Sequence, residues 1–153
     1  MDAKERRRLI ETYRDGYRAV VESLDGITDE ELNRSAEDGW TPRQIVHHLG
    51  DSEMEAATRI RRLLAFESAT ILGYDEKSFA SLAGDRPIEP SLEAFRWSRE
   101  STAQLLERMS DDDWRRVGKH TERGAFGTED WLKMYVSHAQ DHAAQIRRAR
   151  GRD

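Results

Sequence analysis

Aromatic, histidine and small residues recur at alternating steps of four and three between residues 128 and 149 of the chain. The members of this stripe are Trp131, Tyr135, His138, His142, Gln145 and Ala149. Because each residue of an α-helix turns by about 100°, this spacing places the whole stripe on one helix face. The stripe therefore predicts a helix that carries two histidines on its inward face, with Thr128 as its N-terminal cap.

Apolar residues at helical spacing also mark three earlier stretches. The first covers about residues 3–24, the second about 42–66, and the third follows Ser91. Residues 69–90, which contain two glycines and two prolines, predict a long connection between the second and third helices. These features indicate an all-α protein, a four-helix bundle with one long connection. A chain of 153 residues fits a single domain, 1–153.

Capping residues predict where the helices begin and end. Thr41 and Pro42 suit the N-cap and the first position of the second helix, and Ser91 suits the N-cap of the third. Gly26 is a suitable end for the first helix. Residues 120–127 are polar, contain glycine and show no helical period, so we expect an irregular segment there.

Charge and composition exclude several classes of protein. The formal net charge of -5 gives no reason to expect nucleic acid or an anionic membrane as a partner. No apolar run approaches the roughly 20 residues that a membrane span needs, and the N-terminus turns polar at once, unlike a signal peptide. The chain has no cysteine, which excludes thiolate ligands, disulfides and cysteine nucleophiles. We expect a cytoplasmic protein.

The histidine pair is the main candidate for chemistry. His138 and His142 lie one turn apart on a single helix face, so both rings can reach one metal ion. A zinc site needs at least three protein ligands, and the chain has five histidines. His48 lies at the flank of the apolar arc of the second helix and is the expected third ligand, whereas His47 should face solvent and His120 should be dispensable. The alternative is that these are core histidines with ordinary hydrogen bonds.

Two polar residues beside the pair are candidates for a catalytic or orienting role. Asp141 lies at the edge of the inward face and could act as a base, although it could equally be a surface charge. Gln145 could hydrogen-bond a metal ligand or a bound molecule, or could be a polar residue at a helix end. The acids Asp51, Glu53 and Glu55 on the second helix are expected to be surface charges.

Several segments resemble the DinB/YfiT-like superfamily of metal-binding four-helix bundles. Residues 40–49, Trp-Thr-Pro-Arg-Gln-Ile-Val-His-His-Leu, are similar to one of its motifs, and residues 138–146 are similar to the motif of its last helix. Residues 47–52, 74–76 and 87–89 resemble the YfiT branch in particular. The resemblance extends over roughly residues 40–147, and the order and spacing of the motifs make it fairly specific.

The resemblance implies a bundle in which His48, His138 and His142 bind a divalent metal, commonly zinc or nickel, and in which homodimers are frequent. The resemblance implies three kinds of activity. They are S-transfer from low-molecular-weight thiols such as bacillithiol, mycothiol-dependent maleylpyruvate isomerisation, and metal-dependent hydrolysis. One position departs from the pattern. Relatives often have a histidine directly before the last ligand, where this chain has Asp141.

Two classes of function follow. The first is a metal-dependent enzyme, a thiol S-transferase or a hydrolase, that acts on a small-molecule electrophile or thiol at an open metal position. The second is a non-catalytic bundle that binds metal or a small ligand in a stress response. A fourth protein ligand that closes the site would favour the second class, and a solvent-accessible position would favour the first.

Overall fold

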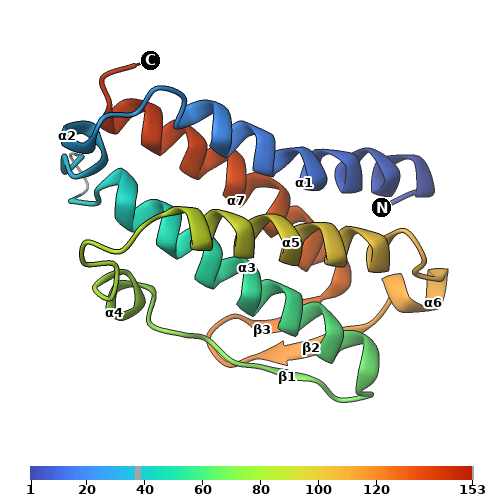
Figure 1. The fold of residues 1–153 in the computed structure, drawn as a ribbon. Coiled ribbons are helices and arrows are strands. Elements are labelled where there is room, and N and C mark those ends of the chain that lie inside the picture. Colours follow the sequence, from blue (N-terminus) through green and yellow to red (C-terminus); the bar gives the residue numbers. More distant parts are fainter. Residues whose placement is uncertain (37–38, 153) are drawn as a thin grey trace.

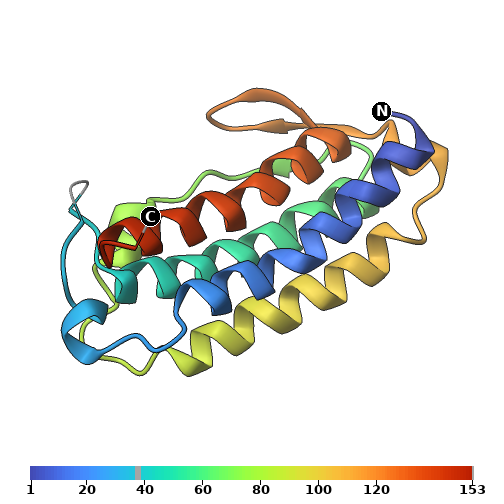
Figure 2. The ribbon, with the colours of Figure 1, turned by 90° about the horizontal axis from the view of Figure 1, so that it is seen from above.

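The computed structural model describes residues 1–36 and 39–152. Long helices dominate it and lie side by side as a bundle, which confirms the four-helix architecture (Figures 1 and 2). The long helices are α1 (Ala3–Ser23), α3 (Pro42–Ala65), α5 (Glu89–Leu106) and α7 (Thr128–Ala149). Helix α1 packs mainly against α7, and α3 packs mainly against α5. Within the described part of the chain, no helix combines the length and apolar character that crossing a membrane requires.

Short elements fill the connections between the long helices. They are α2 (Asp29–Leu32), β1 (Thr70–Ile71), α4 (Glu76–Ala80), α6 (Asp111–Trp114), β2 (Val117–His120) and β3 (Gly124–Gly127). The strands form one sheet in the order β1-β2-β3, in which β1 is parallel to β2 and β2 is antiparallel to β3. The sheet contacts α3 through β1 and α7 through β3, on one side of the bundle (Figure 1).

The hairpin corrects the expectation of an irregular segment at residues 120–127. His120 pairs with Gly124 across its turn, and Gly124 has a φ of +78°, a conformation that favours glycine. The strands are too short to show an alternating apolar pattern, and β1 supplies hydrogen bonds from a distant part of the chain. The pairing of β2 with β3 is local, whereas the pairing with β1 is a tertiary contact that local sequence does not encode.

The helix starts agree with the sequence in one place and differ in two. Thr41 caps α3 as expected: its hydroxyl accepts the Gln44 N–H at 3.2 Å, and Gln44 Oε1 accepts the Thr41 N–H at 3.0 Å. Ser91 is not a cap, because α5 begins two residues earlier at Glu89. Thr128 is the first residue of α7 rather than its cap, and its hydroxyl donates to the Trp114 carbonyl at 2.9 Å.

A buried ion pair crosses the middle of the bundle. Glu53 and Arg99 are each 1% exposed, and the carboxylate lies 2.8 Å from the guanidinium. The Tyr13 hydroxyl donates to Glu53, while Arg99 also donates to the backbone carbonyls of Tyr13 and Tyr135. A Cβ at Gly16 would collide with the guanidinium, so this glycine permits the close approach of α1 and α5. Glu53, expected at the surface, is thus a core residue that ties α3 to α5, α1 and α7.

Candidate metal centre

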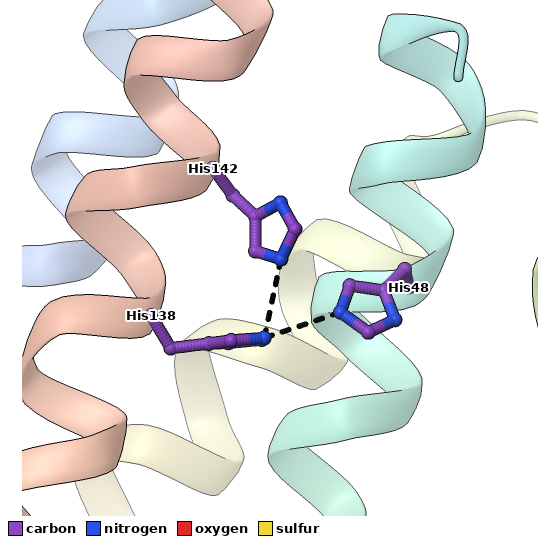
Figure 3. A group of neighbouring side chains, drawn as sticks. All are labelled: His48, His138 and His142. Carbon is purple, nitrogen blue, oxygen red and sulfur yellow. Dashed lines mark hydrogen bonds between the residues drawn. The ribbon is translucent and has the colours of Figure 1, made fainter. Parts of the chain in front are cut away.

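Helices α3 and α7 bring His48, His138 and His142 together, as the sequence analysis predicted (Figure 3). The Nε2 atom of His138 lies 3.1 Å from His48 Nε2 and 3.2 Å from His142 Nε2. All three ligand atoms lie within 4.8 Å of one another. His48 is 2% exposed, and the rings of His138 and His142 are half-buried.

The ring protons explain why these nitrogens favour a cation. Gln145 Oε1 lies 2.6 Å from His142 Nδ1, and an amide oxygen only accepts hydrogen bonds, so Nδ1 carries the proton of the neutral ring. The Nε2 atom of His142 therefore presents a lone pair toward His138. A single proton on His138 Nε2 can serve only one of the two short contacts well. A divalent ion would satisfy all three nitrogens at once.

Two of the three separations between the nitrogens also fit a divalent metal, and the third lies within 4.8 Å. Tetrahedral zinc with bonds of about 2.0–2.1 Å holds its ligand nitrogens about 3.3 Å apart, close to the separations of 3.1 and 3.2 Å found here. Imidazole nitrogens suit both zinc and nickel. The donor set is therefore suitable for either ion.

Packing and one hydrogen bond hold the ligand rings in place. The Trp40 ring contacts His48 edge-on, with 5.4 Å between the ring centroids. The Nδ1 atoms of His48 and His138 are buried and have no hydrogen-bond partner among residues 1–36 and 39–152. Gln145 instead fixes the third ring through Nδ1 of His142. This contact is the geometry that an orienting role for Gln145 requires, and the role itself stays a prediction.

Burial lowers the basicity of two ligands. Burial, and to a lesser extent the electrostatic influence of His142, lowers the pKa of His48 to about 4. Burial, and to a lesser extent the electrostatic influence of His142, His48 and Arg99, lowers the pKa of His138 to about 2. Both rings are therefore neutral near pH 7, which is the form that binds a metal.

The prediction that His47 faces solvent was wrong. Its side chain is 1% exposed, its Nδ1 lies 2.7 Å from the Ser91 hydroxyl, and its Nε2 lies 3.4 Å from the Arg86 carbonyl oxygen. The start of α5 covers this side of α3, and the carbonyl of Ser91 comes so close to Gly50 that a Cβ there would be crowded. His47 is thus a buried residue that joins α3 to α5 and to the loop before α5. It lies outside the cluster of three histidines.

Asp141 and His120 both lie outside the cluster of three histidines, the first exposed and the second buried. Asp141 is exposed on α7, so a role as catalytic base stays a prediction. His120, at the end of β2, is 3% exposed, and its Nδ1 accepts the backbone N–H of Glu122 at 3.1 Å. It is not part of the cluster, although it lines the same pocket as His138.

Sequence reasoning missed this pocket, which has a volume of about 120 Å³. Its lining includes Arg59 from α3 and Tyr74 from the connection before α4. The helical period places Arg59 near His48, but it does not show that its charge is buried. The length of the 69–90 connection and the resemblance of residues 74–76 to the YfiT branch were the signals that pointed to a functional role for Tyr74.

Comparisons with known proteins agree with this geometry. A family model described as "DinB superfamily" matches residues 11–146. A protein of Oceanobacillus iheyensis named "Putative metal-dependent hydrolase OB0782" is 34% identical over 131 residues, which cover 84% of this chain and 76% of the relative. A relative from Geobacillus thermodenitrificans with the same functional name is 35% identical over 155 aligned positions, covering 99% of this chain and 85% of the relative.

Solved structures show the same fold. The structure described as "YfiT from Bacillus subtilis is a probable metal-dependent hydrolase with an unusual four-helix bundle topology" matches with a TM-score of 0.92 and 26% identity, over 100% of this chain and 91% of that one. A mycothiol-dependent maleylpyruvate isomerase matches with a TM-score of 0.76 over 95% of this chain and 61% of that one, and its 13% identity shows the shared fold alone. With its matching family model, relatives and fold, the chain belongs to the DinB superfamily, among relatives named as metal-dependent hydrolases.

Proposed function

We propose that the protein is a metal-dependent hydrolase that acts on a small molecule at His48, His138 and His142. The convergence of the three Nε2 atoms carries this proposal, because it is the donor arrangement of a catalytic zinc site with an open position. The names of the relatives at 34% and 35% identity support the reaction class. A pocket that reaches His138 supports access for a substrate.

The residues of the chain have distinct roles in this proposal. His48, His138 and His142 would hold the ion, and Gln145 keeps the proton of His142 on Nδ1 so that Nε2 faces the ion. A bound zinc or nickel ion supplies Lewis acidity, which polarises a carbonyl and lowers the pKa of water or a thiol. The walls of the site, including Trp40 against His48, restrict solvent around the ligands.

Thiol transfer is the second enzymatic outcome that this site supports. The same ligands and the same open position would activate a low-molecular-weight thiol instead of water. A non-catalytic metal-binding bundle would need a closed ligand shell, and the described residues supply no fourth histidine or carboxylate to the cluster. The homodimer and the cytoplasmic location expected from the sequence remain predictions.

The test combines metal analysis with a substrate screen. Protein purified without added metal should contain about one divalent ion per chain by mass spectrometry of the elements, and His48→Ala should lose it. His47→Gln is the matched control, because it changes the adjacent histidine of the same helix. The zinc-loaded and nickel-loaded proteins are then assayed with chromogenic esters, amides and chlorodinitrobenzene, each with and without thiol.

Hydrolysis that disappears in His48→Ala and persists in His47→Gln is the expected result. Turnover only with thiol present would replace the hydrolase by the S-transferase. A wild-type protein that takes up neither zinc nor nickel would refute both enzymatic functions.

A further inference from the structure

A pocket of about 120 Å³ extends from His138 to the β2–β3 hairpin. Its inner wall is formed by buried or half-buried residues of α3, α7 and the connection before α4. A pocket of this volume has room for a small polar group. The pocket is polar, and its polar groups indicate what kind of group it binds.

Arg59 brings a buried positive charge to this wall. The residue is 7% exposed, and its guanidinium donates to the Tyr135 hydroxyl at 2.9 Å and to the Leu72 carbonyl at 2.8 Å. Both acceptors are uncharged. Among the described residues, the carboxylate oxygen within ion-pair range belongs to Glu55, at 4.0 Å from Nε, and this glutamate is 40% exposed. Buried charges are normally paired closely, and the charge of Arg59 is only weakly neutralised by its neighbours. The guanidinium can therefore attract a negatively charged ligand.

Tyr74 brings a hydrogen-bond donor to the pocket. Its hydroxyl is buried and makes no hydrogen bond of normal geometry in the part of the chain that the structure describes, and its neighbour is the Ser52 hydroxyl, which lines the same pocket. Burial raises the pKa of Tyr74, so the hydroxyl keeps its proton at neutral pH. Its ring lies 5.5 Å from the Arg59 guanidinium carbon, which places the two donors side by side. An unsatisfied buried hydroxyl is costly and points to a missing acceptor.

His120 provides a third donor on the same wall. Its Nδ1 accepts the Glu122 N–H, so the proton of the neutral ring lies on Nε2. The other charged residues that line the pocket, Glu76, Glu122 and Arg123, are exposed and lie at its rim. The inner wall thus combines one permanent positive charge with neutral donors, which matches a group of charge −1 better than a doubly charged phosphate.

We propose that this pocket binds the carboxylate of a small carboxylate-bearing substrate whose reacting group lies at the cluster of three histidines. Arg59 supplies the charge, and Tyr74 and His120 supply hydrogen bonds that orient the carboxylate. The proposal rests on the proposed function, because the pocket adjoins His138, and it narrows the substrate from any small molecule to a carboxylate of limited size.

Tyr74→Phe separates ligand binding from a structural role. Arg59 also links α3 to β1 and α7, so its replacement can disturb the fold. The Tyr74 hydroxyl makes no hydrogen bond of normal geometry within the described residues, so its removal should leave the melting temperature unchanged or raise it. Loss of a hydrogen bond to a charged group should nevertheless weaken carboxylate binding about tenfold or more.

The experiment titrates propionate and its neutral analogue propionamide into ¹⁵N-labelled protein and follows the amide NMR signals. Wild type, Tyr74→Phe, Arg59→Met and the control Tyr17→Phe, on α1, are compared without metal and after zinc loading. The metal-free arm matters because a carboxylate can also bind a metal directly. We expect propionate, but not propionamide, to shift signals of the pocket in wild type and in Tyr17→Phe, with about tenfold weaker binding in Tyr74→Phe.

Equal propionate affinity in wild type and Tyr74→Phe would overturn the proposal, as would binding that occurs only after zinc loading. If Arg59→Met does not fold, Tyr74→Phe still decides. Zinc content is measured on the same samples. A protein that binds propionate in the pocket but no zinc would refute the proposed function and leave the carboxylate site standing, so the two failures are distinguishable.

Discussion

The buried histidines should make the metal-free protein sensitive to acid. An unfolded histidine has a pKa near 6.5, whereas burial holds that of His48 at about 4 and that of His138 at about 2. Below pH 6.5 the unfolded state takes up the proton first. The stability that depends on the neutral rings is therefore fully present above pH 6.5 and is lost as the pH falls toward the folded-state values.

The loss of unfolding free energy at pH 5 does not depend strongly on the pKa of each histidine in the folded state. Because pH 5 lies about 1.5 units below 6.5 and above both folded values, each ring should cost about 2 kcal/mol of unfolding free energy. Together they cost about 4 kcal/mol, a large part of the 5–15 kcal/mol that stabilises a typical domain. His138→Gln removes one of these titrations, so its loss of stability between pH 8 and pH 5 should be about 2 kcal/mol smaller than that of wild type.

Urea unfolding followed by circular dichroism at pH 8, 7, 6 and 5, with chelator present, measures these differences. Comparing each protein with itself at pH 8 removes the direct effect of the substitution on packing. An equal loss of stability in wild type and His138→Gln would refute the reasoning, because it would mean that His138 is not held neutral by burial.

Four further outcomes are expected. Chelation should leave the protein folded and helical by circular dichroism but lower its Tm, because metal at a hundredfold excess over Kd adds about 2.7 kcal/mol, and this benefit should shrink below about pH 6. His47→Ala should keep its metal in elemental analysis but lose about 1–3 kcal/mol in urea, because the Ser91 hydroxyl loses a buried partner. Gln145→Ala should weaken zinc binding about 10–100-fold in a competition titration with a chromogenic chelator. Glu53→Gln should cost about 3–5 kcal/mol of unfolding free energy in urea, because Arg99 would remain charged in the core.

The helices and the cluster of three histidines could be predicted from sequence because both follow from short-range periodicity. The stripe of α7 fixes the relative positions of His138 and His142, and the apolar arc of α3 places His48 beside it. The cap at Thr41 depends on residues within one turn, and it is formed as predicted. These features require only that each helix turns its apolar side toward the bundle.

The failures at His47, at Glu53 and in the sheet share one physical cause, which is contact with a distant segment. His47 lies outside the apolar arc of α3, yet residues before and within the start of α5 cover it. Glu53 is charged, yet it lies in the core because Arg99 approaches from α5. The hairpin at residues 117–127 pairs within itself, and β1 adds a parallel strand from a distant part of the chain. In each case the partner is far away in the sequence, so periodicity within one helix carries no information about it.

These long-range contacts also explain why the metal need not organise the fold. The ion pair between Glu53 and Arg99 joins α3 to α5, and donations from Arg99 to the carbonyls of Tyr13 and Tyr135 extend the network to α1 and α7. All four long helices are therefore linked away from the ligand cluster, whereas the metal would link only α3 and α7. An ion bound at the three histidines as proposed would therefore act on a framework that these contacts already hold together.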